Sequence, residues 1–203
     1  MNRLIASACL AGSLVTLPAL AATPGYYVSG FAGGSFLPDL HFKPSATPVQ
    51  NERFENGFAA GGALGYADEN GFRYELTSLY QHSGVKSVGT TPTTGHISST
   101  GIMANVTYDL NEFAPLGGFT PYVGAGVGAQ NIGGRVGSYS GREWKPAYQA
   151  EAGLRANLGS NTELFGEYRF TQSQSIALRS PTDTARQHFA DHGVLAGLTF
   201  RLN

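Results

Sequence analysis

Apolar and polar residues alternate with a period of two along residues 148–170. Every charged residue of this segment occupies an odd position: Glu151, Arg155, Glu163, Glu167 and Arg169. The even positions carry mainly Ala, Leu, Tyr and Phe. Because a β-strand points successive side chains to opposite faces, the segment predicts two strands that share one apolar and one charged face. A short turn at 159–161 joins them.

The same alternation recurs along the chain between clusters of Gly, Ser, Thr, Asn and Pro, and it predicts eight strands. They span 25–36, 56–67, 72–83, 98–110, 120–131, 145–158, 162–173 and 188–202. The shorter connections are 68–71, 111–119 and 159–161, and the longer, polar ones are 37–55, 84–97, 132–144 and 174–187. This arrangement is typical of bacterial outer-membrane barrels. We therefore expect an all-β fold, an eight-stranded antiparallel up-and-down transmembrane β-barrel.

Composition indicates which face of the barrel meets lipid. Charged residues make up 13% of the chain, against about 25% in typical soluble domains, which is few for a solvated exterior. A soluble barrel would place its apolar face inside. In the membrane version the odd, polar face lines a narrow lumen, and small residues there make room for Arg and Glu. The glycines expected to point inward are Gly61, Gly65, Gly101, Gly153, Gly193 and Gly197.

Turn lengths predict which charged residues oppose one another across the hairpins. A three-residue turn at 159–161 places Glu151 opposite Arg169 and Gly153 opposite Glu167, with Arg155 diagonally between Glu163 and Glu167. A turn at 68–70 would place Arg73 opposite Gly65 and Glu75 opposite Ala63. The predicted lumen charge network comprises Arg73, Glu75, Glu151, Arg155, Glu163, Glu167, Arg169 and Arg201. It is either a mutually neutralising plug, which the small strand number favours, or a polar path or gate for ions.

Aromatic residues fall into two sets that match the two membrane interfaces of a barrel. The set at the short-turn end is Tyr66, Phe72, Tyr74, Tyr108, Tyr122 and Phe200. The set at the long-loop end is Phe58, Tyr80, Trp144, Tyr148 and Phe170. Ordinary sheet packing is the alternative, but it does not predict two bands.

The first residues resemble an export signal rather than part of the fold. Arg3 precedes an apolar run, and Ala19-Leu20-Ala21 is typical of a cleavage site, so we expect a signal peptide at 1–21 and one barrel domain at 22–203. A membrane helix is the alternative, and the run is short for one. The single cysteine, Cys9, lies within that signal, so the mature chain would have no disulfide.

Three stretches, 121–130, 148–170 and 195–203, resemble the opacity-like surface antigens, small eight-stranded barrels akin to the transmembrane domain of outer membrane protein A. The resemblance implies an outer-membrane location and a surface-antigen, adhesin or envelope-stabilising role. The chain end also resembles the signal read by the barrel-assembly machinery, through Gly197, Phe200 and Leu202. It departs from the usual form because the chain closes on Asn203 rather than on an aromatic residue.

Chemistry-bearing residues do not form a recognisable catalytic or metal site. His188 and His192 lie four apart, which on a strand separates them by about 13 Å, and Ser173 and Ser175 have no His and carboxylate spaced as a triad. We therefore expect no enzyme, no cofactor and no metal, with a lipid A-modifying enzyme as a remote alternative. Arg135, Arg142 and Lys145 flank the third long loop and could bind lipopolysaccharide phosphates as a cationic rim.

The pattern and the resemblance together predict a non-enzymatic outer-membrane protein whose barrel is an anchor and whose four long loops are the contact surface. A narrow pore for small solutes or ions is the alternative. The expected partners are outer-membrane lipid, lipopolysaccharide, the assembly machinery and an extracellular ligand of the loops. Nucleic acid is not expected, because the net charge is −1 and basic clusters are lacking. We expect a monomer.

Overall fold

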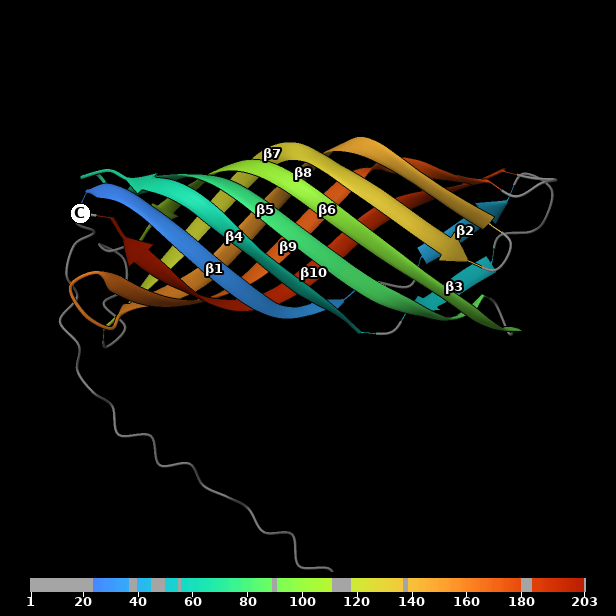
Figure 1. Ribbon diagram of the computed structural model, residues 1–203, viewed down its shortest axis with the longest axis horizontal. Helices are drawn as coiled ribbons and strands as arrows, with labels where there is room; N and C mark the ends of the chain where they lie inside the picture. The colour runs from blue at the N-terminus through green and yellow to red at the C-terminus, as the bar shows by residue number, and fades with distance from the viewer. Residues whose placement is uncertain are drawn as a thin grey trace, which may run out of the picture.

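The protein is a closed antiparallel β-barrel in the computed structural model, which describes residues 24–36, 40–44, 50–54, 56–88, 91–110, 118–136, 139–179 and 184–202 (Figure 1). The wall consists of eight strands: β1 (Gly25–Phe36), β4 (Gly57–Ala67), β5 (Phe72–Val88), β6 (Thr91–Asp109), β7 (Phe119–Val136), β8 (Tyr139–Asn157), β9 (Thr162–Arg179) and β10 (Thr184–Arg201). Pairing of β1 with β10 closes the ring. The predicted fold class and strand number of the barrel are confirmed. The proposed signal peptide lies outside the described residues.

The predicted long loops are wrong in their extent, because most of their residues continue the strands. β5 and β6 leave only residues 89–90 between them, β7 and β8 leave 137–138, and β9 and β10 leave 180–183. The first long connection contains two further strands, β2 (Leu40–Pro44) and β3 (Gln50–Phe54). These segments are rich in Gly, Ser, Thr and Pro, so in sequence they resemble loops rather than strands.

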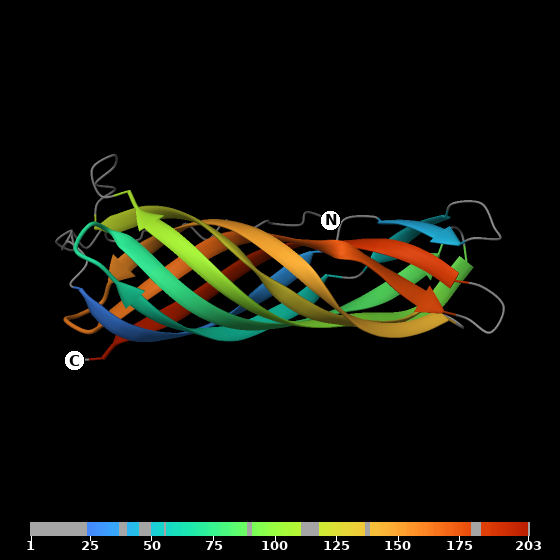
Figure 2. The ribbon, with the colours of Figure 1, turned by 90° about the horizontal axis from the view of Figure 1, so that it is seen from above.

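The hairpin of β2 and β3 completes the extended wall where β1 and β4 end. β2 pairs with β10, with Lys43 opposite Arg186, and β3 pairs with β5, with Glu52 opposite Val88. The hairpin therefore lies between β10 and β5 at the end opposite the start of β1 and the end of β10 (Figures 1 and 2). The barrel continues as a paired wall rather than opening into separate loops, although the pairing of β8 with β9 is interrupted between Ala147↔Ser173 and Ser140↔Arg179.

Side chains alternate between an exposed apolar outer face and a buried inner face, as expected for a barrel that meets lipid. In β5, for example, Tyr74 and Leu76 are exposed, whereas Arg73 and Thr77 are buried. The odd residues point inward in seven of the eight wall strands. No helix among the described residues is long and apolar enough to cross a membrane.

Strand β7 reverses this parity, and its sequence already alternates in that way, with apolar Val123, Ala125 and Val127 at odd positions and mainly Gly at even ones. Its even residues, such as Tyr122 and Gln130, are buried in the lumen, and its odd residues, such as Val123 and Val127, are exposed. The cause is the register: Tyr108 of β6 pairs with Val123, and β8 restores the odd parity. Tyr122 was predicted to lie in the outer aromatic set, and that prediction is wrong.

The turn between β4 and β5 corrects another predicted register. Asp68 accepts hydrogen bonds from the backbone N–H groups of Asn70 and Phe72, at 2.8 and 2.9 Å. Gly71 takes a positive φ of 85°, a conformation favoured by glycine. The backbone N–H of Asp68 also bonds the carbonyl of Phe72 at 2.8 Å, so the turn is 69–71, one residue later than predicted. Arg73 therefore lies opposite Ala67, and Glu75 lies opposite Gly65. The inward direction of both side chains is unchanged.

The remaining aromatic residues of the two predicted sets lie on the outer face. At the short-turn end the rings of Phe72 and Tyr108 pack 4.8 Å apart, and Tyr66 packs against Tyr26 at 5.1 Å. At the other end Phe58 packs against Tyr80 at 5.9 Å. Trp144 and Tyr148 are each more than half exposed, as side chains in a membrane interface would be.

Candidate functional site

The lumen near the short-turn end is filled by an ion-pair cluster. Arg73 of β5 donates to Asp109 of β6 at 2.9 Å and to Glu163 of β9 at 2.7 Å. Arg201 of β10 also pairs with Glu163, and Arg155 of β8 pairs with Asp109. The cluster joins five strands, β5, β6, β8, β9 and β10, because an eight-stranded lumen is narrow enough for long side chains to cross it.

The register places Arg155 opposite Phe165, diagonally between Glu163 and Glu167 as predicted, but its guanidinium turns to other carboxylates. Its guanidinium reaches across to Asp109 and lies 3.9 Å from Glu75. It also lies over the ring of Tyr122, 3.5 Å from the ring centroid.

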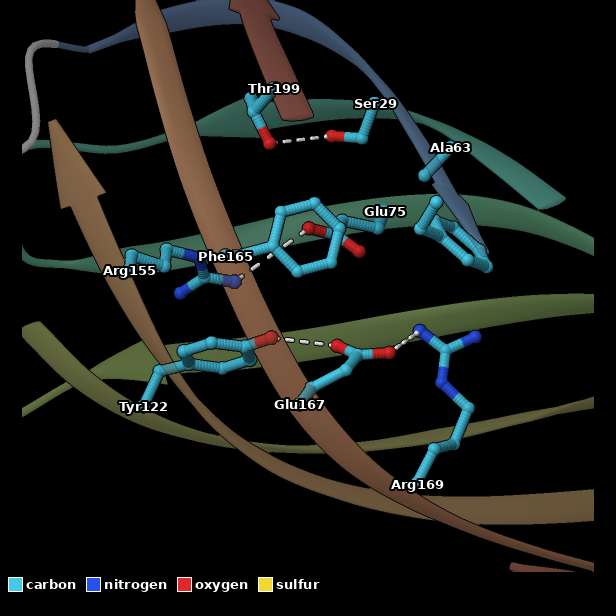
Figure 3. Close-up of a pocket in the computed structure, with 10 residues that line it drawn as sticks. Ser29, Ala63, Glu75, Tyr122, Arg155, Phe165, Glu167, Arg169 and Thr199 are labelled. Atoms are coloured by element: carbon cyan, nitrogen blue, oxygen red, sulfur yellow. Dashed lines mark hydrogen bonds and ion pairs between the residues drawn. The ribbon is translucent and has the colours of Figure 1, made fainter. Parts of the chain in front are cut away.

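A second cluster lies further along the lumen, around Arg169. Glu151 and Arg169 are register partners, which confirms the predicted pairing, and their charged atoms lie 3.1 Å apart. Arg169 also contacts Glu167 at 2.6 Å, and Glu167 accepts a hydrogen bond from the hydroxyl of Tyr122 at 2.6 Å. Figure 3 shows Glu167 between the hydroxyl of Tyr122 and the guanidinium of Arg169.

Aromatic and aliphatic side chains form an apolar layer inside the barrel that the sequence pattern did not predict. Phe31 and Phe165 meet edge to face, with ring centroids 6.2 Å apart. They pack with other buried side chains: Ala59, Ala63, Leu79 and Leu195. The guanidinium of Arg169 lies 5.0 Å from the centre of the Phe31 ring. Ions crossing the lumen would have to pass this layer.

Inward-facing glycines make room for these rings. A Cβ at Gly65 would lie 2.3 Å from the Tyr27 ring, and one at Gly153 would lie 2.7 Å from Tyr122. A Cβ at Gly197 would lie 2.6 Å from Phe165. The prediction that small residues face large ones is therefore confirmed, but at these positions the large groups are aromatic rings rather than charged side chains.

The space left between the charged and apolar layers is very small. A cavity of about 10 Å³ is lined by Ser29, Glu75, Tyr122, Arg155, Glu167 and other side chains of the lumen (Figure 3). This volume corresponds to about one water molecule. The lumen at this level is therefore occluded by its own side chains.

A buried carboxylate lies beyond the apolar layer, toward the long-loop end. Asp191 accepts hydrogen bonds from the hydroxyl of Ser35 and the amide of Gln81. Ser99 in turn donates to Gln81 at 2.9 Å. Asp109 and Asp191 were both missed at the sequence level, although each occupies an odd, inward position of a predicted strand. Because odd residues of these strands point inward, their odd numbers would have placed both carboxylates inside the barrel.

The proposed cationic rim divides between the two faces of the wall. Arg135 and Arg142 are exposed on the outer face. Lys145 lies on the inner face of β8 and pairs with Glu143 at 2.8 Å. The structure therefore brings Arg135 and Arg142 together on the outside and separates Lys145 from them.

The predicted assembly signal occupies the last strand. Gly197 points inward between Phe31 and Phe165, whereas Phe200 and Leu202 are about half exposed on the outer face. The packing of the two rings therefore requires glycine at position 197, whether or not the assembly machinery recognises it. Recognition by the assembly machinery stays a prediction.

No catalytic or metal-binding arrangement is present among the residues that the structure describes. Ser173 is buried and donates to a backbone oxygen at 3.3 Å, and no His or acidic group is placed against it in the described hydrogen bonds. His192 contacts Tyr168 on the outer face. The same described residues contain no group of three His, Cys, Asp or Glu that could hold a metal ion. The side chains of His188 and Ser175 lie outside the described residues.

Comparison with solved structures supports the fold. Neisserial surface protein A is 18% identical, with a TM-score of 0.56, over 88% of this chain and 97% of that one. Outer membrane protein OprG from Pseudomonas aeruginosa is 14% identical, with a TM-score of 0.57 and the same coverages. Outer membrane protein AlkL, determined in lipid bilayers, is 19% identical, with a TM-score of 0.58, over 92% and 96%. These identities show a shared fold alone.

Sequence comparison identifies the family. A curated protein of Gluconacetobacter diazotrophicus, named as an outer membrane protein, is 30% identical over 176 residues, which are 77% of this chain. The match spans 47% of that relative, so this chain covers about half of its length. The family model of the outer membrane protein beta-barrel domain matches residues 7–201. The chain therefore belongs to the outer membrane protein beta-barrel family and is a protein of the outer membrane.

Proposed function

We propose that this protein is a non-enzymatic, non-conducting anchor that presents the extended barrel wall at the cell surface, as a surface antigen, an adhesin or an envelope-stabilising protein. The observation that carries the proposal is the occluded lumen. Arg73, Arg155 and Arg169 are tied to carboxylates on other strands, and the layer around Phe31 and Phe165 leaves a cavity of about 10 Å³. This packing supports the proposal that the interior charges hold the barrel together and do not form a gate for ions.

The wall beyond the aromatic residues supports the surface role. β5 to β10 run for 17 to 19 residues, although about 9–11 residues suffice to cross the membrane. Longer connections of outer-membrane barrels face the outside. The excess length therefore projects outward as a hydrogen-bonded surface, closed by the hairpin of β2 and β3.

Conductance measurements in planar bilayers test the occluded lumen. The full chain should show no stable conductance steps. Replacing both rings, Phe31→Ala and Phe165→Ala, should introduce steps, because it removes the apolar layer. Steps in the unaltered chain whose ion selectivity changes in Glu151→Gln would contradict the proposal and favour the narrow-pore alternative.

A trimmed variant tests the role of the wall. In a strain that lacks the protein, the full chain should restore resistance to detergent. A variant in which short turns replace residues 37–55, 84–96, 133–142 and 175–187 should not restore it. Heat-dependent gel migration would first verify that both forms fold in the outer membrane. Full restoration by the trimmed barrel would contradict a contact role for the wall.

A further inference from the structure

Four side chains with basic groups lie on adjacent strands of the outer face at the long-loop end. They are His82 on β5, His96 on β6, Arg135 on β7 and Arg142 on β8. His96 is the register partner of Arg135, and Arg142 is the partner of Gly133, two residues from Arg135. The rings of His82 and His96 stack with centroids 5.8 Å apart. We call these four residues the outer basic patch.

No described acidic side chain balances the outer basic patch on its own face. Glu143, the nearest acid in the chain to Arg142, lies on the inner face of β8, where it pairs with Lys145. Among the residues whose side chains the structure describes, the acids outside the lumen are Asp68 and Glu69, in a turn at the opposite end of the barrel. The arginines of the inner face form ion pairs with carboxylates. Arg135 and Arg142 point outward, away from those carboxylates.

The outer basic patch lies next to the aromatic residues that mark the membrane surface. On β5, His82 lies two residues beyond the exposed Tyr80, and on β8, Arg142 lies two residues from the exposed Trp144. Exposed aromatic residues of this kind mark the interface between lipid and water in barrels. The patch therefore begins just outside the aromatic band, where the charged parts of the outer-leaflet lipids lie.

We propose that the outer basic patch binds phosphate groups of lipopolysaccharide in the surrounding outer leaflet. Arg guanidinium groups form bidentate, charge-assisted hydrogen bonds with phosphate oxygens, and imidazole N–H groups donate as well. Four adjacent strands cover roughly 15 Å at a strand spacing of about 4.8 Å, so the patch can meet more than one phosphate. Lys145 is excluded from the site because it points into the barrel. The proposal goes beyond the anchor function, and it holds whether or not the lumen conducts.

The test measures lipid A bound to the full chain in nanodiscs of neutral lipid, by native mass spectrometry. The double variant Arg135→Gln and Arg142→Gln should bind lipid A at least about tenfold more weakly, because each lost charge-assisted hydrogen bond typically lowers affinity by about this factor. Lys145→Gln is the control: it removes one positive charge three residues from Arg142, on the inner face, and is compared with Arg142→Gln alone as well as with the double variant. It should bind as the unaltered chain does.

Two further lipids identify the recognised group. Lipid A without phosphates should bind the unaltered chain as weakly as intact lipid A binds the double variant. Phosphatidylglycerol should not displace intact lipid A at equal concentration. Equal loss of binding in the double variant and in Lys145→Gln would overturn the proposal, as would undiminished binding of dephosphorylated lipid A. Displacement by phosphatidylglycerol would show general attraction to anions and would also overturn it.

These substitutions separate the patch from the anchor function. Arg135 and Arg142 are exposed, so their replacement should leave the folded band in heat-dependent gel migration unchanged. The trimmed variant removes the whole wall, whereas the double variant keeps it. If the unaltered chain restores detergent resistance but does not bind lipid A, the patch is refuted and the function of the wall still stands.

Discussion

The inner and outer faces of the same barrel strands carry charge in two different arrangements. Inside, Arg73 and Arg155 share Asp109, and Arg169 contacts both Glu151 and Glu167. Outside, Arg135 and Arg142 face the surroundings with no described carboxylate on their face. A buried charge without its partner is costly, so the interior arrangement follows from the need to fill the lumen. Exposed charges carry no such requirement, which makes the outer face the better candidate for recognition.

Among the substitutions considered, replacing Asp109 should disrupt the inner charge network and lower the free energy of unfolding the most. Asp109→Ala leaves Arg155 without its closest carboxylate and removes one partner of Arg73, so the free energy of unfolding should fall by about 3–5 kcal/mol. Urea unfolding in lipid vesicles measures it. Glu69→Ala, in an exposed turn, is the control and should change stability by less than about 0.5 kcal/mol. An equally small effect at Asp109 would mean that the lumen network adds little stability.

Two glycine substitutions, one on the inner face and one on the outer face, should compare the packing of the two faces, with a smaller change in the free energy of unfolding. Gly65→Ala places a Cβ 2.3 Å from the Tyr27 ring, whose hydroxyl donates to Glu75 at 2.6 Å. This overpacking should cost about 1–3 kcal/mol. Gly30→Ala meets nothing within 4 Å on the outer face and should be neutral or slightly stabilising. The same unfolding measurement applies, and equal effects at the two sites would contradict a tightly filled interior.

Alternation with a period of two predicted the strand number, the closed barrel and the inward face of most charged residues. The pairing of Glu151 with Arg169 was predictable because a three-residue turn leaves little freedom in register. The register at Arg73 was missed because the hydrogen bonds of Asp68 and the conformation of Gly71 decide how that turn closes. The parity of β7 could have been predicted from its own alternation, since Val123 and Val127 occupy odd positions and Gly occupies the even positions between them.

The filling of the lumen was the least predictable part. Phe165 and Tyr122 are apolar or amphipathic, so they look like lipid-facing residues when only polarity is considered. Their inward direction depends on neighbouring glycines and on strand register, which are properties of the closed barrel. The extended strands were missed for a related reason, since polar residues on both faces resemble a loop in sequence.

The hairpin of β2 and β3 and the long strands also determine how high the protein stands above the lipid. An 18-residue strand is about 60 Å long, and at a tilt of about 40° it rises about 45 Å. The hydrocarbon layer takes up about 30 Å of this height, so the strand ends stand roughly 15 Å clear of it. Backbone hydrogen bonds hold these ends in place, so residues at the tips can vary during evolution while the spacing between the displayed positions is kept.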